Sequence, residues 1–180
     1  MRIYTRSGDD GSTALGNGQR VSKAAQRVAA YGEVDELNSM LGVLRAEDLP
    51  GRAAIELAHV QDALFHFGAF LADPTGKYRV PHELLHVAWL ERWIDAMDAE
   101  LPSLRNFVLP GGSRPAALAH LARSVCRRTE RAVVGLRDAG QTSAAEVIPV
   151  LNRLSDALFV CARWLNQQAG IADVAWKGRA

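Results

Sequence analysis

Apolar residues recur every three or four positions over most of the chain, which is the spacing of amphipathic helices. One stripe includes Val34, Leu37 and Leu41 and predicts a helix over residues 22–46, with Ser22 as its N-cap. The same periodicity predicts further helices over residues 52–71, 81–101, 115–138 and 144–169, the last with Gly170 as its C-cap. Five helices joined by short connections, with no convincing set of strands, predict an all-α fold, a five-helix bundle.

The first twenty residues lack the helical period. Residues 2–5 are expected to be extended, and residues 7–13 form a polar loop rich in turn residues, which residues 16–18 extend. We therefore divide a single domain into an N-terminal loop segment, residues 1–20, and a helical bundle, residues 21–180.

Composition excludes several classes of partner. Lys and Arg total 21 against 20 Asp and Glu, and this net charge of +1 provides no general field for nucleic acid or anionic membrane. The N-terminal sequence lacks a signal-peptide core, and no apolar run approaches the roughly 18 residues of a membrane span. We expect a cytoplasmic protein without nucleic-acid or membrane partners, in which Cys126 and Cys161 are buried as small apolar residues.

The predicted helix 115–138 carries a charged stripe. Arg123, Arg127 and Glu130 lie at i, i+4 and i+7 and therefore share one face. Guanidinium groups bind phosphate oxygens in a fork, so the stripe is typical of a polyphosphate site. A solvated, salt-bridged helix face has the same pattern, and periodicity alone leaves both interpretations open.

The N-terminal loop offers a second candidate for phosphate binding. Glycines let backbone N–H groups approach an anion, hydroxyl groups add donors, and Lys23 supplies a charge just beyond the loop. The loop lacks the Gly-Lys-Ser/Thr ending of a Walker A motif, and an ordinary surface turn remains the alternative.

Two polar positions on the other helices could belong to the same site. Asp35 could hold an arginine of the helix 115–138, although a peripheral acidic residue would have the same spacing. Asn152 lies among apolar neighbours at the expected edge of a core stripe, so it is either a structural hydrogen bonder or a ligand contact.

His82, Glu83 and His86 match the H-E-x-x-H pattern of zinc hydrolases. His82 falls in the opening turn of its predicted helix, directly after Pro81, and no third ligand follows at the usual spacing. We interpret both histidines as helix-surface or packing residues and assign no metal ligand to the protein. A zinc hydrolase remains the least favoured alternative.

Six segments, in order and across nearly the whole chain, resemble the PduO-type ATP:cob(I)alamin adenosyltransferase family. They are residues 3–11, 20–23, 31–38, 107–112, 123–131 and 151–156, with Trp176 near the C-terminus as a further match. The resemblance implies transfer of the 5′-deoxyadenosyl group of ATP to cob(I)alamin, which forms adenosylcobalamin and releases triphosphate. It also implies a homotrimer with active sites between subunits, and magnesium on the phosphates of ATP.

The resemblance assigns residues to both substrates. It places ATP against Thr5, Arg6, Ser7, Gly8, Asp9, Gly11, Thr13, Lys23, Arg127, Arg128, Glu130, Arg131 and Asn152. It assigns catalysis to Asp35, Phe107, Arg123 and Arg127, with Asp35 and Arg127 as an intersubunit ion pair and Phe107 reaching the corrinoid.

Three positions depart from the family pattern. Ser7 keeps the hydroxyl of the usual threonine, Asp10 stands where lysine is common, and Ala14 replaces a residue that is often polar. We therefore expect altered nucleotide affinity with the same reaction class. A reductase and an adenosylcobalamin-dependent client enzyme would be partners, and a non-catalytic escort that binds ATP and cobalamin is the main alternative.

Overall fold

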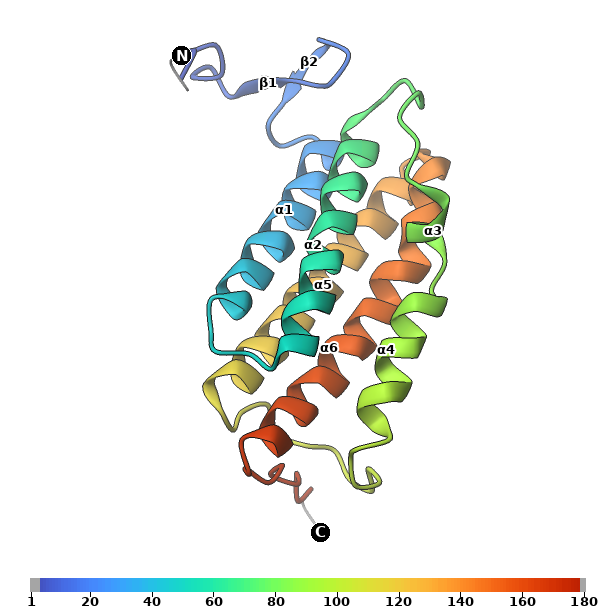
Figure 1. Cartoon of the computed structure of the whole chain (residues 1–180). Coiled ribbons are helices and arrows are strands. Elements are labelled where there is room, and N and C mark those ends of the chain that lie inside the picture. Colours follow the sequence, from blue (N-terminus) through green and yellow to red (C-terminus); the bar gives the residue numbers. More distant parts are fainter. Residues whose placement is uncertain (1–3, 179–180) are drawn as a thin grey trace.

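Four long helices carry the apolar stripes of the sequence and run side by side in the computed structural model of the chain, which describes residues 4–178 (Figure 1). They are α1 (Gln26–Arg45), α2 (Gly51–Ala72), α5 (Arg114–Asp138) and α6 (Ile148–Gln168). Of the segment expected to be extended, residues 2 and 3 lie outside the described residues.

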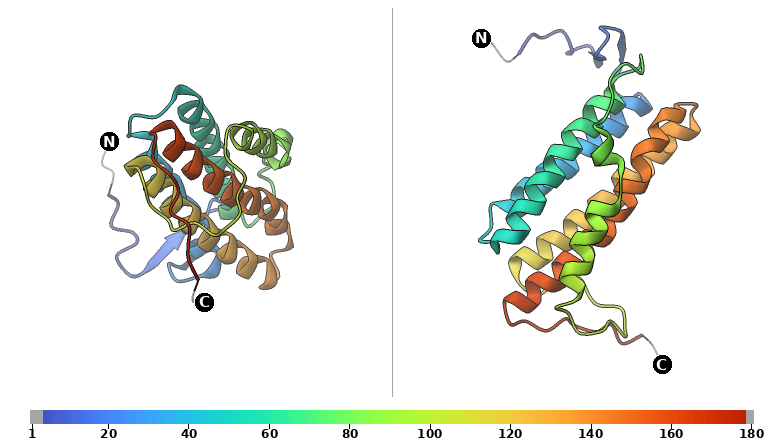
Figure 2. Two further views of the ribbon diagram at one scale, coloured as in Figure 1. Left: turned by 90° about the horizontal axis from the view of Figure 1, so that it is seen from below. Right: turned by 45° about the vertical axis from the view of Figure 1, so that its right-hand side comes forward.

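The core lies between these four helices. α1 packs against α2 and α5, and α6 packs against α5 and α4 (Ala88–Asp98). The view along the bundle in Figure 2 shows the same arrangement, with α4 on the outer side of α6. The largest side chains that are fully buried include Leu37, Leu41, Leu57, Phe67 and Leu158. Burial of each contributes roughly 1.5–3 kcal/mol relative to exposure, so the apolar stripes are what hold the helices together.

The helix expected over residues 81–101 is two helices. A single turn, α3 (His82–Leu85), precedes α4, and His86 between them is extended (φ −84°, ψ 121°). Leu90 and Trp93 share the buried stripe of α4, but Leu84 would lie about 180° from Trp93 on a continuous helix. The break turns Leu84 back into the core, and it raises the number of α-helices in residues 4–178 to six instead of five.

A small antiparallel sheet, which we had not expected, pairs β1 (Ser12–Ala14) with β2 (Arg20–Ser22). Ser22 therefore ends a strand and is not an N-cap. α1 begins at Gln26, after Ala25 in an extended conformation. The hairpin spans the boundary that we had placed after residue 20.

The predicted helix 144–169 begins with a 3-10 helix, η1 (Thr142–Val147), which leads into α6. At its other end the helix stops at Gly170 as expected, although the C-cap itself is Ala169 and Gly170 follows it. Gly170 has φ +68°, and its N–H donates to the carbonyl of Gln167, while that of Ile171 donates to Asn166, both at 2.9 Å. This is the Schellman arrangement, which satisfies the last carbonyls of the helix.

Two irregular parts of the described chain, the hairpin and the α4–α5 loop with the tail, lie at opposite ends of the bundle. The β1–β2 hairpin projects beyond the end where α1 begins, whereas the α4–α5 loop and the tail after α6 lie beyond the other end (Figure 1).

Cys126 and Cys161 are buried and unpaired as expected, and burial raises the pKa of Cys161 to about 12. No helix in residues 4–178 combines the length and apolar character that a membrane crossing requires.

His120 on α5 is a testable irregularity of the core. It is 3% exposed, neither ring nitrogen has a hydrogen-bond partner within residues 4–178, and burial, with the charge of Arg123, lowers its pKa. The unfolded chain therefore takes up a proton below about pH 6.5 that the folded chain resists, so stability falls as the pH drops. We expect His120→Leu to raise the free energy of unfolding by about 1 kcal/mol at neutral pH and to flatten this decline.

Thermal unfolding followed by circular dichroism between about pH 5 and 8 measures both effects. A variant that follows the wild-type curve at every pH would contradict this role of His120.

Candidate active site

The N-terminal loop is held in shape by Lys23. The Lys23 ammonium group donates to the carbonyl of Gly8 at 2.7 Å, and its backbone N–H donates to that of Gly11 at 2.9 Å. The hydroxyl groups of Thr5 and Ser7 lie 2.8 Å apart. Lys23 therefore joins the predicted residues Gly8 and Gly11, and the exposed hydroxyl groups of Thr5 and Ser7 are available to an anion.

Arg20, at the start of β2, is a basic residue beside this loop that the sequence pattern does not single out. Asp10 accepts hydrogen bonds from the backbone and hydroxyl of Ser12 at 2.9 and 2.7 Å, and it lies 3.2 Å from Arg20. The bonds from Ser12, and then the charge of Arg20, hold the pKa of Asp10 below its ordinary value. Asp10 thus ties the loop together internally. Arg20 also donates to Ser7 and brings to the loop a positive charge that Asp10 balances.

The arginine stripe of α5 is partly open to solvent. Arg127 and Arg131 are exposed, whereas Arg123 and Glu130 are half-buried. The Arg123 Nε is buried without a hydrogen-bond partner among the described residues. The exposed guanidinium groups can meet a polyanion directly, as the stripe predicts.

Arg128 is bound within the chain. Its Nε donates to Glu33 at 2.7 Å, and its other end pairs with Glu36. These two carboxylates, Glu36 first, raise the pKa of Arg128. Beside it, the Thr129 hydroxyl donates to the carbonyl of Glu33 at 2.9 Å. Arg128 therefore joins α5 to α1, and two carboxylates balance its charge before any ligand arrives. Its predicted contact with ATP stays a prediction.

Asp35 lies on the surface of α1, beside a cavity of about 350 Å³ between α1 and α2 that Tyr31 and Phe65 also line. Within residues 4–178, neither Asp35 nor Arg127 has an ion-pair partner. The pair predicted between them is thus not formed inside one chain.

The apolar neighbours of Asn152 predicted a position at the edge of the core, but the residue does not lie there. It is exposed on α6, because the apolar neighbours Leu151 and Leu154 turn to the buried side of the helix. Its side chain makes no hydrogen bond to another described residue, so the interpretation as a structural hydrogen bonder has no support in the chain itself.

Phe107 projects from the α4–α5 loop and is 79% exposed. The loop pairs with the C-terminal tail: the N–H of Trp176 donates to the carbonyl of Phe107 at 2.7 Å, and that of Leu109 to Val174 at 2.8 Å. The rings of Phe107 and Trp176 meet edge to face, with centroids 6.3 Å apart. Both rings line a cavity of about 510 Å³, which presents an aromatic surface to a large apolar ligand.

The H-E-x-x-H residues do not form a zinc-hydrolase centre. His82 and His86 are exposed, and their rings contact each other edge-on at 4.2 Å between centroids. No group of three or more His, Cys, Asp or Glu side chains gathers around a common point within residues 4–178. The two histidines therefore stay a surface pair.

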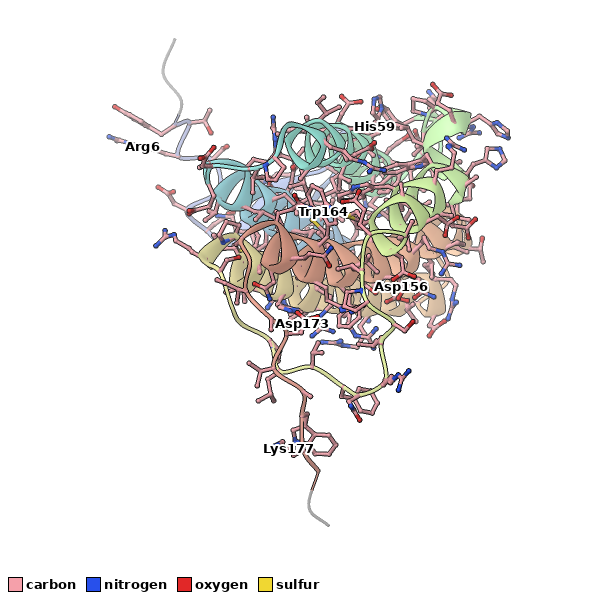
Figure 3. All side chains as sticks on the ribbon, turned by 60° about the horizontal axis from the view of Figure 1, so that its bottom comes forward. Arg6, His59, Asp156, Trp164, Asp173 and Lys177 are labelled. Atoms are coloured by element: carbon pink, nitrogen blue, oxygen red, sulfur yellow. The ribbon has the colours of Figure 1, made fainter. Side chains whose placement is uncertain are left out.

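The N-terminal loop and Phe107 do not meet within one chain. α5 has 25 residues and a length of about 37 Å, and the N-terminal loop and the Phe107 loop lie beyond opposite ends of the bundle. Figure 3 shows Arg6 standing away from the bundle on the N-terminal segment, far from Lys177 on the projecting tail. A site that needs both loops needs more than one copy of the chain.

Comparison with known proteins agrees with the motifs. A family model described as cobalamin adenosyltransferase matches residues 3–165. A cobalamin adenosyltransferase of Cupriavidus metallidurans is 48% identical over 98% of this chain and 94% of its own length. A corrinoid adenosyltransferase of Bacillus subtilis is 43% identical over 100% of this chain and 94% of its own.

A solved structure extends the agreement to the fold. It is a phenylalanine-to-alanine variant of the PduO-type ATP:corrinoid adenosyltransferase of Lactobacillus reuteri, complexed with cobalamin and ATP. It superimposes with a TM-score of 0.91 at 35% identity, covering 98% of this chain and 100% of that one. Because the family match covers most of the sequence and the fold agrees over nearly all of it, this chain belongs to the cobalamin adenosyltransferase family.

Proposed function

We propose that the protein transfers the 5′-deoxyadenosyl group of ATP to cob(I)alamin, forming adenosylcobalamin and releasing triphosphate. The observation that supports this proposal most strongly is that this chain, which belongs to the family, presents two complementary surfaces to solvent. One consists of cations suited to phosphates, on the N-terminal loop and α5, and the other is the aromatic surface of Phe107. Relatives of this chain are corrinoid adenosyltransferases, and the Lactobacillus reuteri structure is complexed with both cobalamin and ATP.

The chemistry needs charge stabilisation more than proton transfer. Cobalt(I) supplies an electron pair to the 5′ carbon of ATP, a cobalt–carbon bond forms, and the carbon–oxygen bond to the triphosphate breaks. Negative charge then accumulates on the leaving triphosphate, where Lys23, Arg127 and Arg131 would stabilise it. We propose that magnesium arrives with the phosphates, whose hard oxygens suit it. No step requires a general base.

Phe107 would act on the corrinoid. Cobalt(II) must be reduced before it can attack, and its lower axial ligand makes the reduction difficult. An aromatic side chain pressed against that face displaces the ligand and excludes water. The exposure of Phe107 supports this role, because the ring has little packing of its own to lose when a ligand covers it.

We propose that the active site forms between subunits of a homotrimer. Three observations support a shared site: the two loops lie at opposite ends, Asp35 and Arg127 are exposed, and neither has an ion-pair partner in residues 4–178. The N-terminal segment, residues 1–20, would then bind nucleotide at the boundary with a neighbouring copy. The number three rests on the family resemblance.

The first test is direct. We expect purified protein, mixed without oxygen with ATP, magnesium and chemically reduced cob(I)alamin, to produce the absorbance spectrum of adenosylcobalamin. Omission of either ATP or protein should abolish the change. Binding of both ligands without product would favour the escort, and stoichiometric zinc in the purified protein would revive the hydrolase.

Phe107→Ala tests the aromatic surface. We expect kcat for adenosylation to fall by about 100-fold, because the corrinoid is no longer held in a reactive geometry, while ATP affinity changes little. Ile55→Ala, which truncates another exposed apolar side chain on α2, is the matched control and should leave both quantities near wild type. Equal losses of rate and of ATP affinity would contradict the assignment.

Charge reversal tests the shared site. We expect Asp35→Arg alone and Arg127→Asp alone each to assemble poorly and to lose most activity, because like charges would face each other across the interface. Combining both changes in one chain should restore assembly, since an arginine from one chain then meets an aspartate from the next at every interface of the trimer. Light scattering measures the recovery; a double variant that still assembles poorly would place the pair elsewhere.

A further inference from the structure

The segment that carries Phe107 has little support of its own. Phe107 lies in the α4–α5 loop, and the tail that pairs with this loop is exposed as well. Two backbone hydrogen bonds and the contact of Phe107 with Trp176 join them, and both partners lie outside the helices. An exposed loop joined only to an exposed tail would sample many positions, so its attachment to the bundle decides where Phe107 lies.

Arg163 on α6 supplies one attachment. Its side chain is 4% exposed, its Nε donates to the Asp173 carboxylate at 2.8 Å, and its Nη2 donates to the carbonyl of Pro102 at 2.9 Å. Pro102 begins the loop and Asp173 lies in the tail. One buried guanidinium group therefore binds both segments at once.

Asn166, one turn further along α6, supplies the second attachment. Its side chain is 3% exposed. It donates to the carbonyl of Gly111 at 3.0 Å and to Asp173 at 3.3 Å, and it accepts from the N–H of Ser113 at 2.8 Å. The backbone passes so close to this amide that a Cβ on Gly112 would collide with it, and Gly112 has φ +102°. Only glycine fits there without strain.

We propose that Arg163, Asn166 and Asp173 are positioning residues for adenosyl transfer, a clamp that fixes both ends of the Phe107 loop and the tail that pairs with it. The clamp sets the place of the aromatic ring without touching either substrate. This inference rests on the proposed role of Phe107 and adds to it the residues through which the bundle controls that ring. The clamp lies beneath the loop and contributes nothing to the apolar contacts between the long helices.

Asp173→Asn is the test variant, because it keeps the shape of the side chain while removing the charge that Arg163 binds. Glu91→Gln is the matched control. Glu91 also pairs with an arginine of α6, Arg153, at 3.1 Å, and this pair is remote from the Phe107 loop. Both variants remove one carboxylate that pairs with an arginine of α6, but only Asp173 belongs to the tail that pairs with the Phe107 loop.

The first readout needs no activity. Arg105 lies exposed within the loop, and trypsin cuts after arginine in mobile segments. We expect cleavage after Arg105 to be about tenfold faster in Asp173→Asn than in wild type or Glu91→Gln, because the loop opens more often. Equal cleavage rates in all three proteins would overturn the clamp, whatever the protein catalyses.

The second readout is a double-mutant cycle on the rate of adenosylation. We expect Asp173→Asn to lower kcat by about 10- to 100-fold with little change in the KM for ATP, whereas Glu91→Gln keeps wild-type values. In a Phe107→Ala background the same change should cost almost nothing, since the ring it positions is absent. Independent, multiplicative losses would overturn the positioning role. A wild type without activity would instead refute the proposed function and leave the cleavage test in force.

If Asp173→Asn does not fold, Trp176→Pro replaces it. This change removes the N–H that donates to Phe107 and leaves the core untouched, and Trp176→Leu keeps that N–H as its control. We expect faster cleavage after Arg105 in the proline variant than in the leucine variant. Equal cleavage in the two would overturn the idea that loop and tail are positioned as one unit.

Discussion

The length of the bundle is the constraint on which the rest of the protein depends. α5 packs along both α1 and α6, and the buried apolar side chains between them keep these helices aligned over their whole length. The irregular segments therefore lie at the two ends of the bundle. The hairpin and N-terminal loop, which carry candidate phosphate-binding groups, lie at one end, and the loop with Phe107 lies at the other. A rigid body of this length cannot bring its own ends together, which is why a shared site is the arrangement that suits the fold.

Some charged groups form ion pairs within the chain and others face solvent. The geometry of the helix decides which of the two a given side chain does. One step along α5 turns the side chain by about 100°, so Arg128 meets Glu33 and Glu36 of α1 while its neighbour Arg127 faces solvent. The same division holds at the other end, where the buried Arg163 binds loop and tail within the chain. Arginine density in the sequence thus overstates the positive charge available to a ligand.

Much of the fold could be predicted from the sequence, because the spacing of apolar residues and the residue types at helix ends are local signals. The four long helices follow from their stripes, but the break after α3 was missed, because Leu84 was counted in one stripe with residues of α4 although its phase differs from that of Trp93. The hairpin was missed because three-residue strands show no alternation, and the pairing of Asp10 with Arg20 because it depends on that hairpin. For the site, the residue pattern pointed to the α5 stripe, the N-terminal loop with Lys23, Asp35 and Asn152, each with an alternative left open, and the resemblance supplied the other residues. The clamp was out of reach, since Arg163 and Pro102 are 61 positions apart.

Because the hairpin lies outside the bundle, function and thermal stability, which usually vary together, can change separately there. In the described chain, residues 4–23 form their hydrogen bonds largely among themselves and contribute only Leu15 to the buried side chains. The energy that holds the helices together is therefore nearly independent of this segment. A substitution there can abolish function in a protein that melts normally, so thermal stability is a poor guide to damage in this segment.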